Sequence, residues 1–368
     1  MTISDSFSPP VLTTRAMLDP TRLCKLRCSF CYYLHGDLES VKPWEKQKRE
    51  VLDAVARGCT AGDLTGGDPL TNPMIVDFVR LCVENKISLR IISSLICPQK
   101  VLDDVMDAGV DDWLISLHGA KEETHNAIVH NYENGPVEKT KYRQIQVKRL
   151  ESIMKRMQWC GNYVIIEKNQ LEMADFARWV VSLPRPPHII NFLNFNPHYE
   201  WGSGKHKQEA ISQIVDYRIA GPILDEAIDI LEGAGIGVNC RYTPMCAVAE
   251  RHRKNICNGM HNPFDGGEWE NSIGGKTYAD GVRYGKNLTN GNEEKNAPCN
   301  TCAHQWICGG ANKIWHKLAN EKFGCEVLHP LPVLAEGSDP NDFWMYRKEN
   351  VLGLDPRVQG FRKLEQVS

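Results

Sequence analysis

The sequence predicts an α/β protein built on a parallel sheet. Its 368 residues are 42% hydrophobic and 24% charged, which is enough apolar material for two cores, or for one large core with a smaller satellite. Short β-rich segments alternate with longer helical ones through most of the chain, which is typical of strand–helix units. Glycine, proline and asparagine mark the boundaries between them. We count six such units and expect their strands to lie side by side in one sheet.

Each strand is expected where a short apolar, β-branched run stands between turn signals. Five strands are expected at 13–18, 88–93, 112–117, 163–167 and 188–195, and a further strand, second in chain order, is expected to end at residue 66. In such units the carboxyl ends of all strands meet at one edge of the sheet, where catalytic loops are found in closed βα barrels. Residues that directly follow the strands are therefore the first candidates for a site.

The helices are delimited by caps and breakers. Pro43 and Gly58 flank the first helix, Asn72 caps the second, and Pro98 and Gly109 bound the third. The helices are expected at 44–57, 72–85, 98–109, 137–158, 170–182 and 208–231, the last as one helix or two. The glycine-rich run 233–237 follows a helix and is interpreted as a helix C-cap.

Three cysteines share one short loop, CKLRCSFC, at positions 24, 28 and 31. A four-iron four-sulfur cluster needs four ligands, so Cys24, Cys28 and Cys31 would leave one iron open to another ligand. The alternative is a zinc site, with His35 as a candidate fourth ligand.

CKLRCSFC, with the aromatic Phe30 before its last cysteine, resembles the signature loop of the radical S-adenosylmethionine (SAM) superfamily. The resemblance implies a partial (β/α)6 TIM-like barrel with a four-iron four-sulfur cluster at the C-terminal strand ends. It further implies that SAM binds the open iron and is split to a 5′-deoxyadenosyl radical, which abstracts a substrate hydrogen. The protein itself would bind and orient the cofactor and the substrate, and it would exclude water from them.

A second motif follows about 35 residues after the loop. Gly66, Gly67, Asp68 and Pro69 resemble the GGEP motif of this superfamily, with Asp in place of Glu. Paired glycines let the backbone approach a ligand closely. The resemblance implies that this strand end holds the methionine amine of SAM.

The resemblance also marks other strand ends as SAM contacts. Ser93 and Ser94 end the third strand, where the family often binds ribose or the methionine carboxylate. Ser116 and His118 end the fourth, in the family-like run SLHGAKEETHN, and Asn169 follows the fifth near the expected adenine position. The alternative for each residue is an ordinary capping or loop role.

The chain closes on a second cysteine-rich region. Its cysteines are Cys240, Cys246, Cys257, Cys299, Cys302, Cys308 and Cys325. This region resembles the SPASM extension of radical SAM enzymes, which implies two auxiliary four-iron four-sulfur clusters. Asn312 stands where the family pattern has a cysteine, so a single-cluster, twitch-like arrangement is also open, as is a zinc site made by the last four cysteines.

We therefore expect three parts: a radical SAM core over 1–235, an auxiliary-cluster domain over 236–330 and a tail over 331–368 that packs on the barrel. A net charge of −3 without a basic stripe argues against nucleic acid as the partner. The sequence has neither a run long enough to span a membrane nor a secretory signal, so a cytoplasmic protein is expected.

The expected partners are a peptide or small-molecule substrate and an electron donor of the flavodoxin or ferredoxin type. Three functions stay open: oxidative modification or crosslinking of a peptide, modification of a small metabolite such as a sugar or aminocyclitol, and metal-cluster or zinc binding without turnover.

Overall fold

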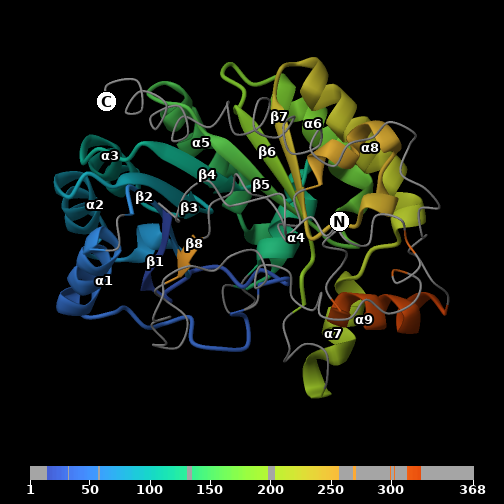
Figure 1. The fold of residues 1–368 in the computed structure, drawn as a ribbon, viewed down its shortest axis with the longest axis horizontal. Coiled ribbons are helices and arrows are strands. Elements are labelled where there is room, and N and C mark those ends of the chain that lie inside the picture. The colour runs from blue at the N-terminus through green and yellow to red at the C-terminus, as the bar shows by residue number, and fades with distance from the viewer. Residues whose placement is uncertain are drawn as a thin grey trace, which may run out of the picture.

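The computed structural model describes residues 15–31, 33–56, 59–130, 135–197, 204–256, 268–270, 299, 302 and 313–324. Within these ranges eight strands form one parallel sheet, in the order β7-β6-β5-β4-β3-β2-β1-β8 (Figure 1). The strands are β1 (Arg15–Thr21), β2 (Ala61–Gly66), β3 (Ser88–Ser93), β4 (Asp112–Ser116), β5 (Cys160–Ile165), β6 (Ile189–Asn194), β7 (Gly237–Arg241) and β8 (Glu268–Glu270). Since β1 to β7 are neighbours in chain order, each follows its predecessor across the sheet, which is the open, TIM-like arrangement of radical SAM enzymes.

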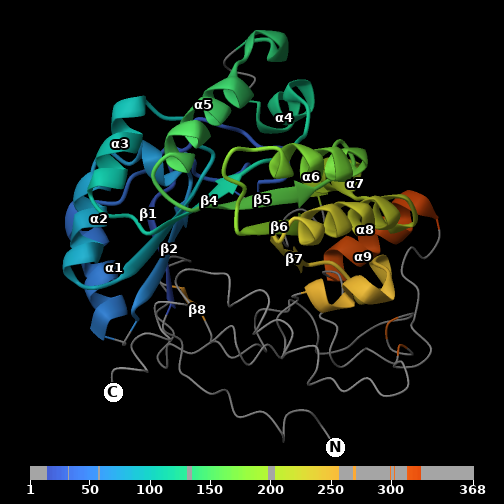
Figure 2. The same ribbon diagram turned by 90° about the horizontal axis from the view of Figure 1, so that it is seen from above.

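Helices cover the outer side of the curved sheet. They are α1 (Trp44–Ala56), α2 (Ile75–Glu84), α3 (Gln99–Asp107), α4 (Glu122–Val129), α5 (Tyr142–Met154), α6 (Met173–Val181), α7 (Lys207–Gln213), α8 (Tyr217–Gly233) and α9 (Lys313–Phe323). Figure 2 shows α1, α2 and α3 along one half of the sheet and α6 and α8 along the other. None of the helices that the structure describes is long and apolar enough to cross a membrane.

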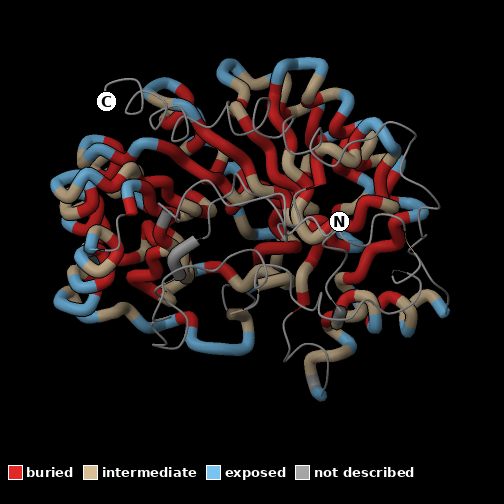
Figure 3. The backbone as a smooth tube through the Cα atoms, viewed as in Figure 1, coloured by how far each residue is buried: buried red, intermediate tan, exposed pale blue. Residues whose placement is uncertain are grey.

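The core lies between the sheet and these helices. The strands are buried along most of their length, as Figure 3 shows, and β2 has four buried residues in a row. Continuous burial of this kind is expected of a parallel strand covered on both faces. Tyr163 of β5 packs against Phe176 of α6 and Phe192 of β6, with ring centroids 4.7 and 5.6 Å away. These rings join the sheet to its outer helical layer.

The predicted α/β fold is confirmed. All six expected strand–helix units are present, and β3 has the expected bounds. β7 extends the sheet by one strand, inside the segment that we expected to belong to the auxiliary-cluster domain. Gly235, with φ of +76° just after α8, has the backbone expected of a helix C-cap. Our division of the chain into three parts stays a prediction, and the tail over 331–368 lies outside the described residues.

Several boundaries differ from the expectation, and α4 was not expected; three of the differences have a clear local cause. The helix expected over 137–158 is a 3-10 turn, Val137–Lys139, followed by α5, because Thr140 is extended and its hydroxyl donates to the Val137 carbonyl at 2.8 Å. β5 begins at Cys160, three residues before the expected 163, where Gly161 and Asn162 pair with β6 despite low strand propensity. The segment over 208–231 is two helices, because the Asp216 side chain caps α8 by accepting from Arg218 N at 2.9 Å.

Candidate functional site

The structure brings the expected site residues to one edge of the sheet. The cysteine loop follows β1, Gly66 ends β2, Ser93 ends β3 and Ser116 ends β4. Since these strands are parallel, their carboxyl ends share that edge. Asn169 lies four residues beyond the end of β5, on the same side.

The GGDP motif is attached to the start of the cysteine loop through backbone contacts. Gly67 N donates to Thr21 O at 2.8 Å, and Asp68 N donates to Leu23 O at 2.9 Å. The fit leaves no room for side chains, since a Cβ on Gly67 would lie 2.3 Å from the carbonyl oxygens of Arg22 and Leu23. Two motifs that are separate in sequence therefore form one structural unit.

Gly66 needs a backbone conformation that other residues rarely adopt. Its φ is +120°, and a Cβ there would lie 2.1 Å from both Thr21 O and the Asp19 carboxylate. The two glycines thus serve close backbone packing against the loop.

The carboxylate of Asp68 is fully engaged by neighbouring strand ends. One oxygen, Oδ1, accepts from Leu70 N at 3.1 Å and Ser93 Oγ at 2.8 Å. The other, Oδ2, accepts from Ser94 N at 3.0 Å and from the Ser94 hydroxyl. Because both serine protons go to Asp68, these hydroxyls could accept from a ribose hydroxyl but have no proton for a methionine carboxylate. Their contact with SAM stays a prediction.

The three loop thiols lie close enough to affect one another. Burial, then the negative charge of Asp68, raises the pKa of Cys24 to about 12, and burial with the neighbouring cysteines raises the pKa of Cys28. Burial also raises the pKa of Cys31. Such a crowded thiol set is costly to ionise without a bound cation, and metal ligation is what converts thiols to thiolates. The donor set therefore fits a cationic iron cluster.

The zinc alternative for this loop depends on His35 as the fourth ligand. Among the described residues, two groups of three ligand atoms lie within 4.8 Å of one another, and the loop sulfurs do not form such a group. A tetrahedral zinc ion would draw its thiolates to about 4 Å from one another. His35, the proposed zinc ligand, contacts Glu209 instead, with Nε2 and Oε2 3.1 Å apart, and its ring stacks on His206.

His118 and Asn169 tie the ends of β4 and β5 together. Asn169 donates to His118 O at 2.9 Å and to Val164 O at 2.8 Å, and its own oxygen accepts from Ile166 N. His118 Nδ1 accepts from Val164 N at 3.2 Å, and its ring meets Phe30 edge-on at 4.6 Å. Both amide protons of Asn169 are engaged, and its oxygen has one acceptor site beyond the bond from Ile166 N. Its expected role as a SAM contact stays a prediction. Phe30 and His118 form an aromatic wall beside the cysteine loop.

Gln146 of α5 is a residue of this edge that sequence reasoning missed. Its amide donates to Ser94 O at 3.0 Å and to Ser116 O at 2.7 Å, so it joins β3 to β4. Its oxygen accepts from Arg143, whose guanidinium lies over Trp179 at 4.1 Å. The available signal was a buried glutamine within a polar helix, which periodicity alone does not distinguish from a surface residue.

The buried histidines make this edge sensitive to acid. Burial, then Arg143, lowers the pKa of His118 to about 3, and burial lowers the pKa of His125 as well. Both histidines are neutral in the folded protein and protonate near pH 6.5 in the unfolded chain. Their contribution to the free energy of unfolding is therefore fully present above about pH 6.5 and is lost as the pH drops toward 3. Each contributes a slope of up to about 1.4 kcal/mol per pH unit.

We therefore expect His118→Gln, which keeps an acceptor for Val164 N, to reduce the loss of unfolding free energy between pH 7 and pH 5. Urea denaturation at the two pH values measures that loss. An unchanged loss in the variant would show that His118 is not a source of the acid sensitivity.

The C-terminal cysteines are described only in part. Cys240 lies in β7 and is fully buried, and Cys246 follows six residues later. Burial raises the pKa of Tyr217 on α8, and the two cysteines raise it further. Cys302 N donates to Cys299 O at 3.2 Å. Cys257, Cys308, Cys325 and Asn312 lie outside the described residues, so the expected auxiliary clusters stay a prediction.

Residues 18–179 match the family model described as the radical SAM superfamily. No curated protein sequence matches the chain. Among solved structures, the chain is similar to Streptococcus suis SuiB bound to SAM, with a TM-score of 0.56, 14% identity, and 82% of this chain and 73% of that chain covered.

Two further structures are similar. SuiB bound to its precursor peptide SuiA has a TM-score of 0.54 and 14% identity, and 82% of this chain and 72% of that chain are covered. Native anSMEcpe with AdoMet and the Cp18Cys peptide has a TM-score of 0.50 and 12% identity over 94% of this chain and 99% of that chain. In a further SuiB structure the match spans about half of that protein, 49%. The family match over residues 18–179 includes the signature loop, and these solved structures show that the chain shares their fold.

Proposed function

We propose that this chain is a cytoplasmic radical SAM enzyme that modifies a peptide substrate. The observation that carries the proposal is the single unit formed by the cysteine loop and the GGDP motif at the C-terminal edge of the sheet. Similarity in fold to SuiB bound to precursor peptide SuiA and to anSMEcpe bound to a peptide supports a peptide as the substrate.

Each residue of the unit has a proposed task. Cys24, Cys28 and Cys31 hold a four-iron four-sulfur cluster. The close packing of Gly66 and Gly67 against the start of the loop fixes the GGDP strand end, where SAM is expected to bind, beside that cluster. The chemistry that cluster and SAM would supply when bound is reductive cleavage of SAM and abstraction of a substrate hydrogen. An electron donor of the flavodoxin or ferredoxin type would deliver the electron.

Asp68 and His118 are proposed to hold the cysteine loop and the GGDP motif in the position that SAM binding requires. Asp68 fixes the ends of β2 and β3 relative to each other, and the ring of His118 supports Phe30 of the loop by an edge-on contact. None of these groups has to donate a proton for SAM to be cleaved, so their task is positioning.

We further propose one or two auxiliary four-iron four-sulfur clusters held by the C-terminal cysteines. Cys240 lies in β7 and Cys246 in the 3-10 turn Met245–Ala247 that follows it, so the two thiols are close in the chain and could belong to one ligand group. Iron analysis of the reconstituted chain would give about twelve irons for three clusters and about eight for two. About four irons with one zinc held by sulfur ligands would refute the auxiliary clusters.

The test is 5′-deoxyadenosine formation by the anaerobically reconstituted, reduced chain. Peptides encoded beside its gene are expected to stimulate the reaction, whereas a panel of sugars and aminocyclitols is not. Stimulation by a metabolite alone would favour the small-molecule alternative. Absence of SAM cleavage under every condition would favour a binding protein without turnover.

A further inference from the structure

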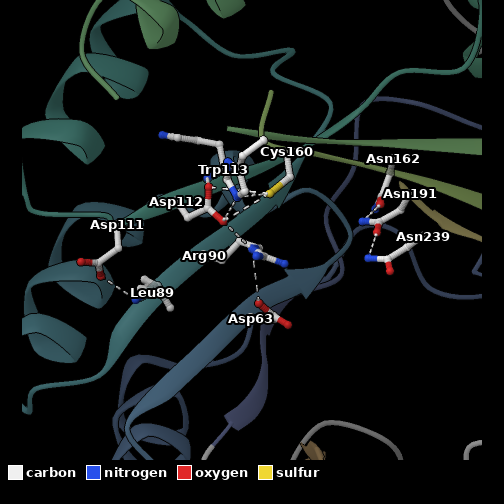
Figure 4. Close-up of polar contacts among 11 residues, drawn as sticks. Asp63, Leu89, Arg90, Asp111, Asp112, Trp113, Cys160, Asn162, Asn191 and Asn239 are labelled. Carbon is white, nitrogen blue, oxygen red and sulfur yellow. Dashed lines mark hydrogen bonds and ion pairs between the residues drawn. The ribbon is translucent and has the colours of Figure 1, made fainter. Parts of the chain in front are cut away.

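A second group of ligand-type side chains lies at the opposite end of the sheet from the cysteine loop. Asp112 is the first residue of β4, Cys160 is the first residue of β5, and His188 directly precedes β6. The amino ends of these strands face away from the edge where SAM is proposed to bind. Figure 4 shows Asp112 and Cys160 approaching each other from neighbouring strands.

The three side chains converge on one point. Cys160 Sγ lies 3.0 Å from His188 Nε2 and 3.5 Å from Asp112 Oδ2, and His188 Nε2 lies 4.0 Å from the same Asp112 oxygen. Ligand atoms around a tetrahedral zinc ion are about 3.3–3.6 Å apart, given bonds of about 2.0–2.3 Å. The observed separations fall around these values, so the ligand set is close to its bound geometry.

The same geometry argues against a nucleophilic relay. In a relay, one histidine nitrogen serves the nucleophile and the other is oriented by the acid. Here a single nitrogen, Nε2 of His188, faces both the thiol and the carboxylate. Cys160 and Asp112 are also buried, with exposures of 1% and 0%, which leaves a substrate no access to the sulfur.

The surrounding charges suit a divalent ion. Arg90 Nε donates to Asp112 Oδ2 at 2.8 Å and lies 4.0 Å from Asp63 Oδ1 (Figure 4). With Cys160 as a thiolate, the sulfur and the Asp112 carboxylate would offer a divalent cation two negatively charged ligands. Buried charge is tolerated only when it is compensated, and such a cation would compensate it.

Arg90 also fits the role of an outer partner for a metal ligand. Carboxylates that bind metals are usually hydrogen-bonded by a neighbour that fixes their orientation. The second oxygen of Asp112 accepts from Trp113 N at 2.9 Å, so both oxygens are held in place. A set of one thiolate, one imidazole and one carboxylate matches zinc rather than magnesium or calcium, which prefer oxygen ligands.

We propose that Asp112, Cys160 and His188 form a zinc site at the amino ends of β4 to β6. Three protein ligands leave one position of a tetrahedral ion for water. The ion would join three strands at their amino ends, independently of the iron–sulfur chemistry at the carboxyl ends.

The test is zinc analysis of the full chain after iron–sulfur reconstitution, incubation with zinc and removal of loosely bound metal. About one zinc per chain is expected in the wild type. Cys160→Ser should lose it while its iron content stays unchanged. Cys82→Ala is the matched control, since Cys82 is equally buried but lies on α2, and it should retain the zinc.

X-ray absorption at the zinc edge of the wild type decides the case even if the Cys160 variant does not fold. The expected spectrum has one sulfur at about 2.3 Å and nitrogen or oxygen ligands at about 2.0–2.2 Å. A wild-type protein without zinc, a spectrum with three or four sulfurs, or equal zinc loss in Cys82→Ala would overturn the proposal.

Discussion

Cys28→Ala is expected to abolish 5′-deoxyadenosine formation and to remove about four irons per chain. Cys28 is the middle cysteine of the loop and a proposed cluster ligand, and burial together with the thiols of Cys31 and Cys24 raises its pKa. Removing one of three thiolates leaves too few ligands to hold a cluster that keeps one iron open for SAM. Iron analysis and product chromatography under anaerobic conditions measure the two losses.

Cys82→Ala serves as the control for this loss. Its thiol is buried in α2 and packs in the hydrophobic core, away from any proposed ligand group. We expect it to keep full iron content and SAM cleavage, with a modest stability loss. Normal SAM cleavage by Cys28→Ala would contradict the assignment of the loop.

Gly67→Ala is expected to cut SAM cleavage about a hundredfold while the chain still folds. The added methyl group would meet backbone carbonyls of Arg22 and Leu23 at 2.3 Å, and backbone atoms cannot swing aside as side-chain ends can. Relief requires the GGDP strand end to move away from the cysteine loop. A misplacement of about 1 Å costs on the order of 10²-fold in rate, and overpacking costs roughly 1–3 kcal/mol of stability.

Gly233→Ala is the matched control, because a Cβ there meets nothing within 4 Å. It lies at the end of α8, where alanine is the better helix former, so stability should be unchanged or slightly higher. Comparable activity of Gly67→Ala and Gly233→Ala would show that close packing of the two motifs does not matter for turnover.

Local signals were sufficient to predict most of the architecture. The run SLRIIS lies between turn residues and forms β3 with the expected bounds, and Pro98 is the N-cap of α3, one residue before the helix begins. Where tertiary pairing overrides propensity, prediction failed. CGNYVI contains glycine and asparagine at positions that pair with β6, and β7 was overlooked beside a cysteine-rich region.

The sequence motifs of the site could be predicted, but the contacts between them could not. The spacing of the loop cysteines and the GGDP run marked the two halves of the unit, but their backbone contacts connect residues more than forty positions apart. The same limit applies to Gln146, which joins two strands from a helix, and to the engagement of Ser93 and Ser94 by Asp68. Such hydrogen bonds depend on side-chain direction in three dimensions, which spacing does not encode.

Electron paramagnetic resonance of the reduced, reconstituted chain tests the central claim most directly. SAM binding to an open iron of the loop cluster should change the spectrum of that cluster, and Cys28→Ala should remove the responding signal. A wild-type spectrum that SAM leaves unchanged would contradict the claim that Cys24, Cys28 and Cys31 hold a SAM-binding cluster.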